Sequence, residues 1–320
     1  MRPPTTALLI YPVTLLVGSL FSILSPTARG SRQSRHEHPA ALAPSIASNM
    51  NLSPPNPVNY FARKNNIFNL YFVKVGWLWT TLAFVSLLVS QPAYTAASAH
   101  QPRRLAQAAL RYSLATLAWY LTTQWFFGPP IIDRSFVITG GKCARVVAET
   151  SGNPAAAIAQ EGSVSAGLER LFTAAACKAA GGTWTGGHDV SGHVFMLVLA
   201  TSMLVFEAVG AMRAVFVVEE GKKEKVDGGV AQSEGERVQA QVQGQVQDEE
   251  EGDWMRIWSL RLVGAVMVLG WWMLFMTSIW FHTWLEKWSG LLIALGTVYV
   301  VYILPLSVPS WRDIVGVPGI

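Results

Sequence analysis

The sequence predicts an all-α integral membrane protein with six transmembrane helices. Of its 320 residues, 51% are hydrophobic and 14% are charged, whereas soluble domains carry roughly 25% charged residues. Thirteen tryptophans support this class, because tryptophan is enriched at membrane interfaces. Six apolar segments meet or approach the roughly 20 residues that a spanning helix needs. They are 7–24, 70–89, 107–127, 190–212, 257–280 and 289–306.

The first segment, 7–24, is short and contains Pro12, so a secretory signal is the alternative interpretation. A signal peptide has a basic N-terminal region and ends at a cleavage site flanked by small residues. Here one basic residue, Arg2, precedes the segment, and no clear small-residue cleavage site follows it. We therefore expect a true span.

Long connections separate the segments within what is predicted as a single membrane domain, 1–320. The first, 25–69, is rich in Pro, Ser and Asn and is predicted to be irregular. It contains the glycosylation sequon Asn51-Leu52-Ser53. The loop 128–189 holds an alanine-rich insertion, 144–176. The segment 219–253 is dominated by Lys, Glu, Gln and Gly, so we expect a disordered acidic loop.

Charge and cysteine content exclude several classes of protein. The net charge is +4, and the basic residues are scattered rather than arranged in a stripe, so no nucleic-acid partner is expected. Two cysteines are too few for a cysteine-rich framework or a four-cysteine zinc site. Cys143 and Cys177 lie in the same loop, 128–189, and form either a disulfide or two unpaired thiols.

Two histidines are the strongest candidates for chemistry. His193 opens the fourth apolar segment, and His282 follows the fifth. Consecutive spans run antiparallel, so the start of one and the end of the next lie on the same membrane face. Two imidazoles there can act on one phosphate group, since one attacks phosphorus or activates water and the other protonates the leaving oxygen. The alternative is that each histidine is an interfacial anchor.

The residues beside these histidines fit the same chemistry. Asp189 lies four residues before His193, and Glu286 lies four residues after His282. On a helix, such offsets place side chains on one side, where a carboxylate orients an imidazole and stabilises its protonated form. Ser191 is suited to cap a helix N-terminus, and Gly192 lets the backbone approach a ligand closely. A helix N-terminus is also an anion site.

Three basic residues of the loop 128–189 are predicted on the same face as the histidines. Arg134, Lys142 and Lys178 are candidate phosphate ligands. For each one alone, a solvated loop charge is the alternative.

The same histidines offer a second alternative, a zinc site. Together with Glu286 or Asp189 they supply a possible set of ligands. No His-Glu-x-x-His sequence is present. The prediction is therefore a site without metal or other cofactor.

Glu207 is an acidic residue in the middle of the segment 190–212. An acid inside a membrane span is a functional hypothesis by default. A structural hydrogen bond between helices is the alternative, and the sequence leaves both open.

Several short stretches between about residues 60 and 310 resemble, in order, the fat storage-inducing transmembrane (FIT) proteins. The chain looks most like the fungal branch of that family. The stretches are 124–129 (QWFFGP), 132–134 (IDR), 139–143 (TGGKC), 177–184 (CKAAGGTW), 188–193 (HDVSGH) and 281–287 (FHTWLEK).

The resemblance implies a fold, a location and an activity. It implies six spans in the endoplasmic reticulum membrane, with both termini cytosolic and the active histidines lumenal. The implied activity is that of an acyl-CoA diphosphatase, which cleaves fatty acyl-CoA to acyl 4′-phosphopantetheine and adenosine 3′,5′-bisphosphate. It also implies a role in lipid droplet formation and phospholipid balance. The family's two histidines correspond to His193 and His282.

The family is in turn similar to lipid phosphate phosphatases of the phosphatidic acid phosphatase type 2 group. Ser191-Gly192-His193 matches that group's Ser-Gly-His, and His282 with Glu286 resembles its nucleophilic His followed four residues later by Asp. By this analogy His282 is the nucleophile and His193 the acid, although the reverse stays open. The group's Lys-x6-Arg-Pro and its Ser-Arg before the later histidine are missing, so its phosphate ligands cannot be carried over.

Two other functions remain open at this point. One is a lipid phosphate phosphatase acting on phosphatidic acid. The other is a non-enzymatic membrane protein that binds or partitions triacylglycerol or diacylglycerol.

Overall fold

The computed structural model describes residues 4–28, 59–63, 65–96, 100–124, 131–144, 177, 183–185, 190–227 and 238–319. The helices of this part of the chain are η1 (Pro4–Leu9), α1 (Ile10–Leu24), η2 (Tyr60–Ala62), η3 (Asn69–Val73), α4 (Gly76–Ser90), α5 (Pro92–Thr95), α6 (Gln101–Thr123), α7 (Ile131–Ile138), α10 (Gly192–Asp227), α11 (Val238–Trp280), α12 (Trp284–Val298), η4 (Tyr299–Ile303), α13 (Leu304–Ser307) and α14 (Pro309–Val315).

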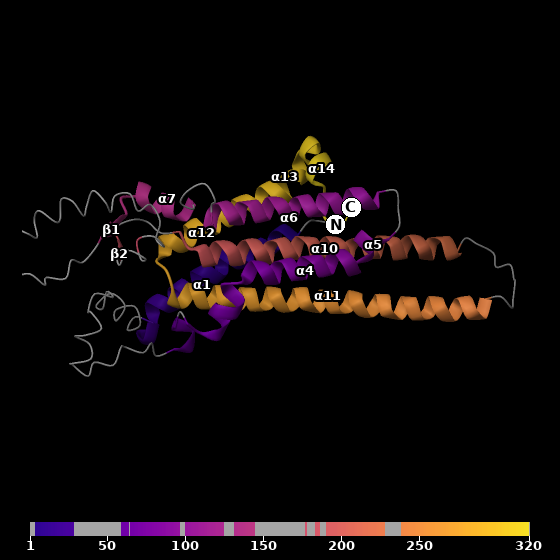
Figure 1. Ribbon diagram of the computed structural model, residues 1–320, viewed down its shortest axis with the longest axis horizontal. Coiled ribbons are helices and arrows are strands. Elements are labelled where there is room, and N and C mark those ends of the chain that lie inside the picture. Colours follow the sequence, from indigo (N-terminus) through magenta and orange to yellow (C-terminus); the bar gives the residue numbers. More distant parts are fainter. Residues whose placement is uncertain are drawn as a thin grey trace, which may run out of the picture.

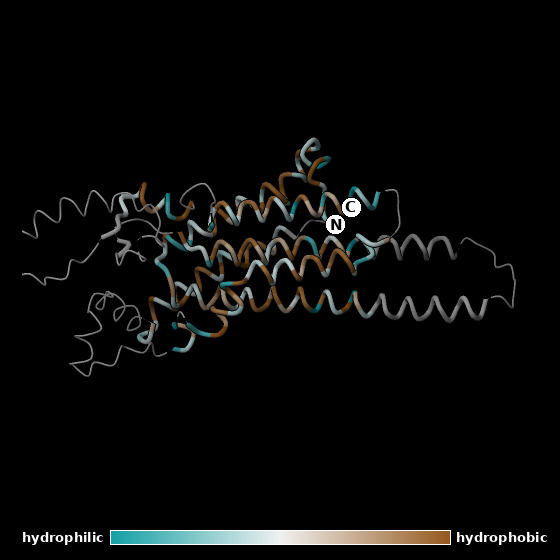
Figure 2. Tube along the Cα trace, viewed as in Figure 1, coloured by the Kyte–Doolittle hydropathy of each residue, from teal (hydrophilic) through white to brown (hydrophobic). Residues whose placement is uncertain are grey.

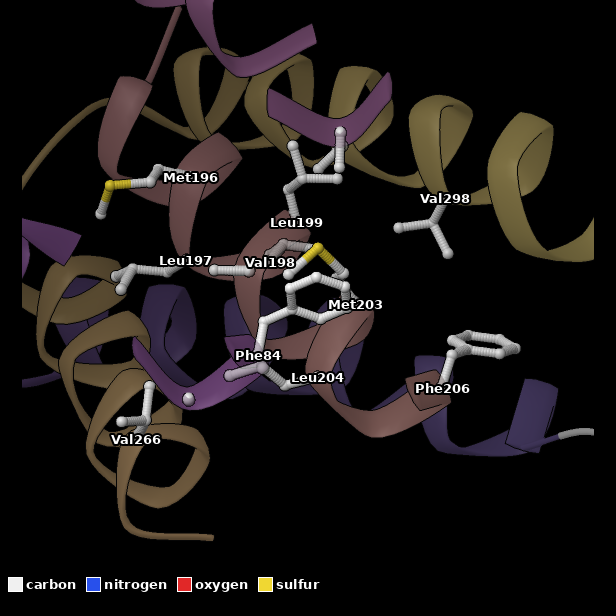
Figure 3. Close-up of a cluster of buried hydrophobic side chains, with 14 of the residues drawn as sticks. Phe84, Met196, Leu197, Val198, Leu199, Met203, Leu204, Phe206, Val266 and Val298 are labelled. Atoms are coloured by element: carbon white, nitrogen blue, oxygen red, sulfur yellow. The ribbon is translucent and has the colours of Figure 1, made fainter. Parts of the chain in front are cut away.

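The long helices lie side by side as one elongated bundle, with α10 at its centre (Figure 1). Helix α10 packs against α4, α6, α11 and α12. Within its segment Gly192–Ala214, 89% of the residues of an 18-residue apolar stretch are buried. The segment is apolar on every side, as expected for a helix surrounded by other helices. Its side chains meet those of α4, α11 and α12 in a single core (Figure 3), where Phe84, Met203, Leu204, Val266 and Val298 come together.

Four of the predicted spans form helices that are long and apolar enough to cross a membrane, by length and composition, within the described residues. They are Thr5–Leu24, Gly192–Ala214, Trp254–Trp280 and Trp284–Ser307. Hydrophobic residues dominate the middle of the bundle (Figure 2). Pro12 is tolerated because it lies in the first turn of α1, where its missing N–H breaks no helical hydrogen bond. The chain is therefore a multi-helix membrane protein.

The other two predicted spans are also helical but less clearly membrane-spanning. The segment 70–89 becomes η3 and α4, and α4 has only 15 residues. The segment 107–127 falls largely in α6, which has 23 residues but carries Arg103, Arg104 and Arg111. Length and composition thus support four spans, and these two helices lie in the same bundle.

The fold is helical as predicted, and the loop 128–189 adds one small element that was not predicted. It contains α7 and a short antiparallel sheet of β1 (Lys142–Ala144) and β2 (Thr183–Thr185). Cys143 pairs with Trp184 across the two strands. Cys177 is disulfide-bonded, and the sequence holds one other cysteine, Cys143. A disulfide in this loop is thus confirmed over two unpaired thiols. Of the predicted insertion, 145–176 lie outside the described residues.

The expectation of a disordered loop at 219–253 is wrong for most of that segment. Helix α10 continues to Asp227, and α11 already begins at Val238, so both helices extend beyond the rest of the bundle (Figure 1). Lys, Glu and Gln are good helix formers, and helices continued from a span need no new nucleation. Residues 228–237 lie outside the described part, as do 29–58 of the first loop.

Glu207 forms a buried ion pair with Arg111 of α6, so the structural alternative for this acid holds. Two nitrogens of the guanidinium bind the two carboxylate oxygens at 2.6 and 2.9 Å. The hydroxyl groups of Tyr94 and Tyr302 donate to the same carboxylate at 2.8 and 3.1 Å. The third nitrogen of Arg111 donates to the Val315 carbonyl at 3.0 Å. The pair therefore joins α6 and α10 to the C-terminal segment.

Candidate functional site

The structure brings His193 and His282 together. Their ring centroids are 6.2 Å apart, and the ring planes meet at 49°. His193 lies in the first turn of α10, and His282 lies just after the end of α11, at the same end of the bundle (Figure 1). Both side chains are partly exposed. The position predicted from antiparallel spans is therefore the observed one.

The first turn of α10 is fixed by residues that the sequence singled out. Ser191 Oγ accepts a hydrogen bond from the Val194 N–H at 3.3 Å, and so caps the helix. The Ser191 N–H donates to the Glu286 carbonyl at 3.0 Å, which ties α10 to the first turn of α12. Gly290 permits this close approach, because a Cβ there would stand 2.6 Å from the Ser191 carbonyl oxygen. The cap and this hydrogen bond thus hold His193 close to the first turn of α12, which carries Glu286.

The backbone of His282 adopts an unusual conformation. Its φ of 61° is the only positive value at a non-glycine residue in the described part of the chain. A left-handed residue just beyond a helix end is usually glycine, and another residue there costs about 1 kcal/mol. His282 lies between the end of α11 at Trp280 and the start of α12 at Trp284. Such strain, where it is observed, is typical of functional sites.

Glu286 orients His282. Its Oε2 lies 2.9 Å from His282 Nδ1 and also accepts the Thr283 N–H at 3.1 Å. An ionised carboxylate only accepts, so Nδ1 carries the proton and Nε2 presents its lone pair. Among the described residues, Nε2 of His282 has no hydrogen-bond partner. The side chains of His282 and Glu286 are 21% and 20% exposed, respectively. Solvent and substrate can therefore reach the His282 imidazole.

His193 has a different partner, which the sequence analysis missed. Its Nε2 lies 3.0 Å from Oδ1 of Asn69, a residue that is 8% exposed in η3. The available signal was an asparagine at the start of an apolar segment, where a polar side chain needs a partner. Its partner is 124 residues away in the chain, so no local pattern identifies it.

Lys287 is a second residue that the analysis missed. It is 3% exposed, and its ammonium donates to Ser19 Oγ at 3.1 Å and to the Ser278 carbonyl. It therefore fastens α12 to α1 and to the last turn of α11. A cation is favourable at a helix C-terminus because the terminal carbonyls carry partial negative charge. Lys287 thus holds the two ends of the turn that carries His282.

The remaining predicted site residues are not shown at the site. Asp189 and Lys178 lie outside the described residues. Lys142 begins β1, and Arg134 lies on α7. Helix α7 does reach the start of α10, because Ile132 Cδ1 lies 3.3 Å from where a Cβ of residue 192 would stand. No group of three or more His, Cys, Asp or Glu arranged for a metal ion occurs within the described residues.

Comparison of the sequence with known proteins identifies its family. Acyl-coenzyme A diphosphatase fit1 of Schizosaccharomyces pombe is 27% identical over 307 residues, which is 96% of this chain and 87% of that protein. Acyl-coenzyme A diphosphatase FITM2 of Drosophila melanogaster is 29% identical, over 78% of this chain and 52% of its own length. Acyl-coenzyme A diphosphatase SCS3 of Saccharomyces cerevisiae is 29% identical, over 45% of this chain and 54% of its own length.

No solved structure matches the chain. The family described as fat storage-inducing transmembrane protein matches residues 57–302, a range that includes both histidines, Asn69 and Glu286. The match covers most of the chain, which confirms the resemblance seen in the motifs. The chain therefore belongs to the fat storage-inducing transmembrane protein family.

Proposed function

We propose that this protein is an acyl-CoA diphosphatase of the endoplasmic reticulum membrane. It hydrolyses fatty acyl-CoA to acyl 4′-phosphopantetheine and adenosine 3′,5′-bisphosphate, and thereby supports lipid droplet formation and phospholipid balance. The observation that carries the proposal is the pair of imidazoles 6.2 Å apart, one of them held by a carboxylate. The names of the relatives supply the substrate class.

His282 is the nucleophile in this proposal. Nδ1 is held by Glu286, so Nε2 is the reacting nitrogen. Nε2 attacks phosphorus, a P–N bond forms and the phosphoanhydride P–O bond breaks. Glu286 stabilises the positive charge that develops on the imidazole, as the third member of a catalytic triad does. No metal or other cofactor takes part in this scheme.

His193 is the acid. It gives a proton to the leaving phosphate oxygen, and then takes a proton from the water that hydrolyses the P–N bond. Reacting atoms need to approach within about 3–3.5 Å. The ring centroids are 6.2 Å apart, so both imidazoles are close enough to contact the same phosphate group.

Phosphate binding comes from the surroundings of the pair. The N-terminus of α10 begins at Gly192, beside His193, and a helix N-terminus favours anions. We propose Arg134, Lys142 and Lys178 as phosphate ligands, and Asp189 as an additional orienting acid for His193. Removal of any one of these basic side chains should raise KM for acyl-CoA more than it lowers kcat.

The assay that tests this function supplies oleoyl-CoA to the purified protein and follows adenosine 3′,5′-bisphosphate by mass spectrometry. We expect equal amounts of the bisphosphate and oleoyl 4′-phosphopantetheine, with no release of free coenzyme A. Phosphatidic acid and triacylglycerol form the comparison panel. Phosphate release from phosphatidic acid alone would establish a lipid phosphate phosphatase instead. Binding of triacylglycerol without any hydrolysis would establish a partitioning protein.

Six spans, with both termini cytosolic and the histidines lumenal, complete the proposal. Ser22 near the end of α1 donates to the Ile279 carbonyl near the end of α11, so α1 begins at the far end from His282. Arg103 and Gln107 at the start of α6 bind the Asp313 carbonyl. The C-terminal segment therefore lies at the opposite end of α6 from α7. These contacts support one face for both termini.

Glycosylation mapping tests this orientation. We expect the natural sequon at Asn51 to be modified, with a mass shift removed by endoglycosidase and absent in Asn51→Gln. A new sequon made by Ala231→Asn, in the connection between α10 and α11, should remain unmodified because that connection faces the cytosol. Modification of the new sequon, with Asn51 left bare, would reverse the proposed orientation.

A further inference from the structure

We propose that Ser22 of α1 is a positioning residue for His282, because its hydroxyl caps the end of α11 from which the His282 turn departs. This inference rests on the proposed function, since it assigns a role in that reaction. Ser22 is 1% exposed, and its Oγ donates to the Ile279 carbonyl in the last turn of α11. It lies outside residues 57–302, the range that matches the family.

The end of α11 lacks the backbone hydrogen bonds that usually accompany a left-handed residue. At such an end, the N–H groups of that residue and of the next one donate to carbonyls of the last helical turn. With His282 as the left-handed residue, these acceptors would be the carbonyls of Ser278 and Ile279. Within the described part of the chain, however, the His282 N–H donates to no backbone carbonyl, and the Thr283 N–H donates to Glu286 Oε2 at 3.1 Å.

Side chains from other helices bind these two carbonyls instead. Ser22 Oγ donates to the Ile279 carbonyl, and the Lys287 ammonium donates to the Ser278 carbonyl. The same ammonium donates to Ser19 Oγ at 3.1 Å. Ser19 and Ser22 are three residues apart on α1, so they lie on one face of that helix. Both caps of α11 therefore depend on α1, which supplies one of them directly and holds the other.

Helix α1 is packed closely against this end of α11. The two helices lie side by side (Figure 1), and a Cβ at Gly18 would stand only 2.8 Å from the Ser278 Cβ. Without the Ser22 hydroxyl, the carbonyl of Ile279, a residue that is 5% exposed, loses its partner. A left-handed backbone persists only where the surrounding structure fixes it. Loss of the cap should therefore let the His282 turn relax and move Nε2 away from its line of attack.

Ser22→Ala in the full-length protein tests this role with oleoyl-CoA as substrate. We expect kcat to fall roughly tenfold, because a displacement of about 1 Å in a reacting group can cost up to about 100-fold. We expect little change in KM, since no contact with substrate is removed. Gly18→Ala, which forces α1 away from Ser278, should lower kcat in the same way.

Thr14→Val is the matched control. Thr14 Oγ1 accepts a hydrogen bond from Trp271 Nε1 at 2.9 Å, so this substitution also removes a hydrogen bond between α1 and α11. It leaves the carbonyls of the last turn of α11 untouched. We expect its kcat and KM to equal those of the wild type, while thermal unfolding in detergent shows similar small losses of stability in Thr14→Val and Ser22→Ala.

Amide hydrogen exchange gives a readout that does not depend on activity. The Phe281 N–H donates to the Thr277 carbonyl at 3.0 Å, beside the carbonyl that Ser22 caps. Its exchange should be faster in Ser22→Ala than in the wild type, and unchanged in Thr14→Val. The same exchange rate in all three proteins, or an equal fall of kcat in both variants, would overturn the role of Ser22. Failure of the proposed function is a separate result, since the wild type would then release no bisphosphate while the exchange rates still report on Ser22.

Discussion

Replacement of His282 by glycine is expected to abolish hydrolysis of oleoyl-CoA without loss of folded protein. The substitution removes the proposed nucleophile, and we expect kcat to fall by about 10⁴-fold or more. The backbone at this position has φ 61°, a conformation that glycine adopts without strain. The variant should therefore melt at a temperature no lower than that of the wild type. Bisphosphate release and thermal unfolding in the same detergent measure the two effects.

His282→Ala is the matched control for that variant. It removes the same imidazole but keeps a Cβ in the left-handed conformation, so it should be as inactive as His282→Gly and less stable by about 1 kcal/mol. Addition of His193→Ala to His282→Gly should cause little further loss, because residues that act as one unit have non-additive effects. Activity within tenfold of the wild type in either single variant would refute the assignment of His282.

Hydropathy and the alternation of span direction were enough to predict the helical bundle and the meeting of the two histidines. Both depend on patterns along the chain. The pairing of Glu286 with His282 was also predicted, but from the wrong geometry. The offset of four residues was attributed to one continuous helix. In the structure, His282 lies outside any helix, and Glu286 reaches back from the first turn of α12.

The errors have physical reasons of their own. Composition alone suggested disorder for 219–253, whereas its Gln, Glu and Lys residues favour helix once a neighbouring span provides the start. Asn69 and Lys287 were missed because each acts through a contact far away in sequence, with His193 and Ser19 respectively. A single sequence carries no period or spacing that reports such contacts.

Loss of the Arg111 side chain is expected to have the largest effect on stability. Arg111 is 1% exposed and Glu207 is fully buried, so Arg111→Met leaves a carboxylate in the core without its cation. Breaking a buried pair in this way costs about 3–5 kcal/mol. It also frees the Val315 carbonyl, which Arg111 binds. Unfolding in detergent by heat or denaturant measures the loss.

The double variant Arg111→Met with Glu207→Leu distinguishes the effect of an unpaired buried charge from the effect of altered packing. Removal of both charges leaves no unpaired ion, so we expect it to be more stable than Arg111→Met. Arg103→Ala is the surface control. Arg103 lies 3.9 Å from Asp313, and these side chains are 61% and 74% exposed, so its loss should cost less than about 1 kcal/mol. If the double variant is no more stable than Arg111→Met, the buried charge is not what makes that variant unstable.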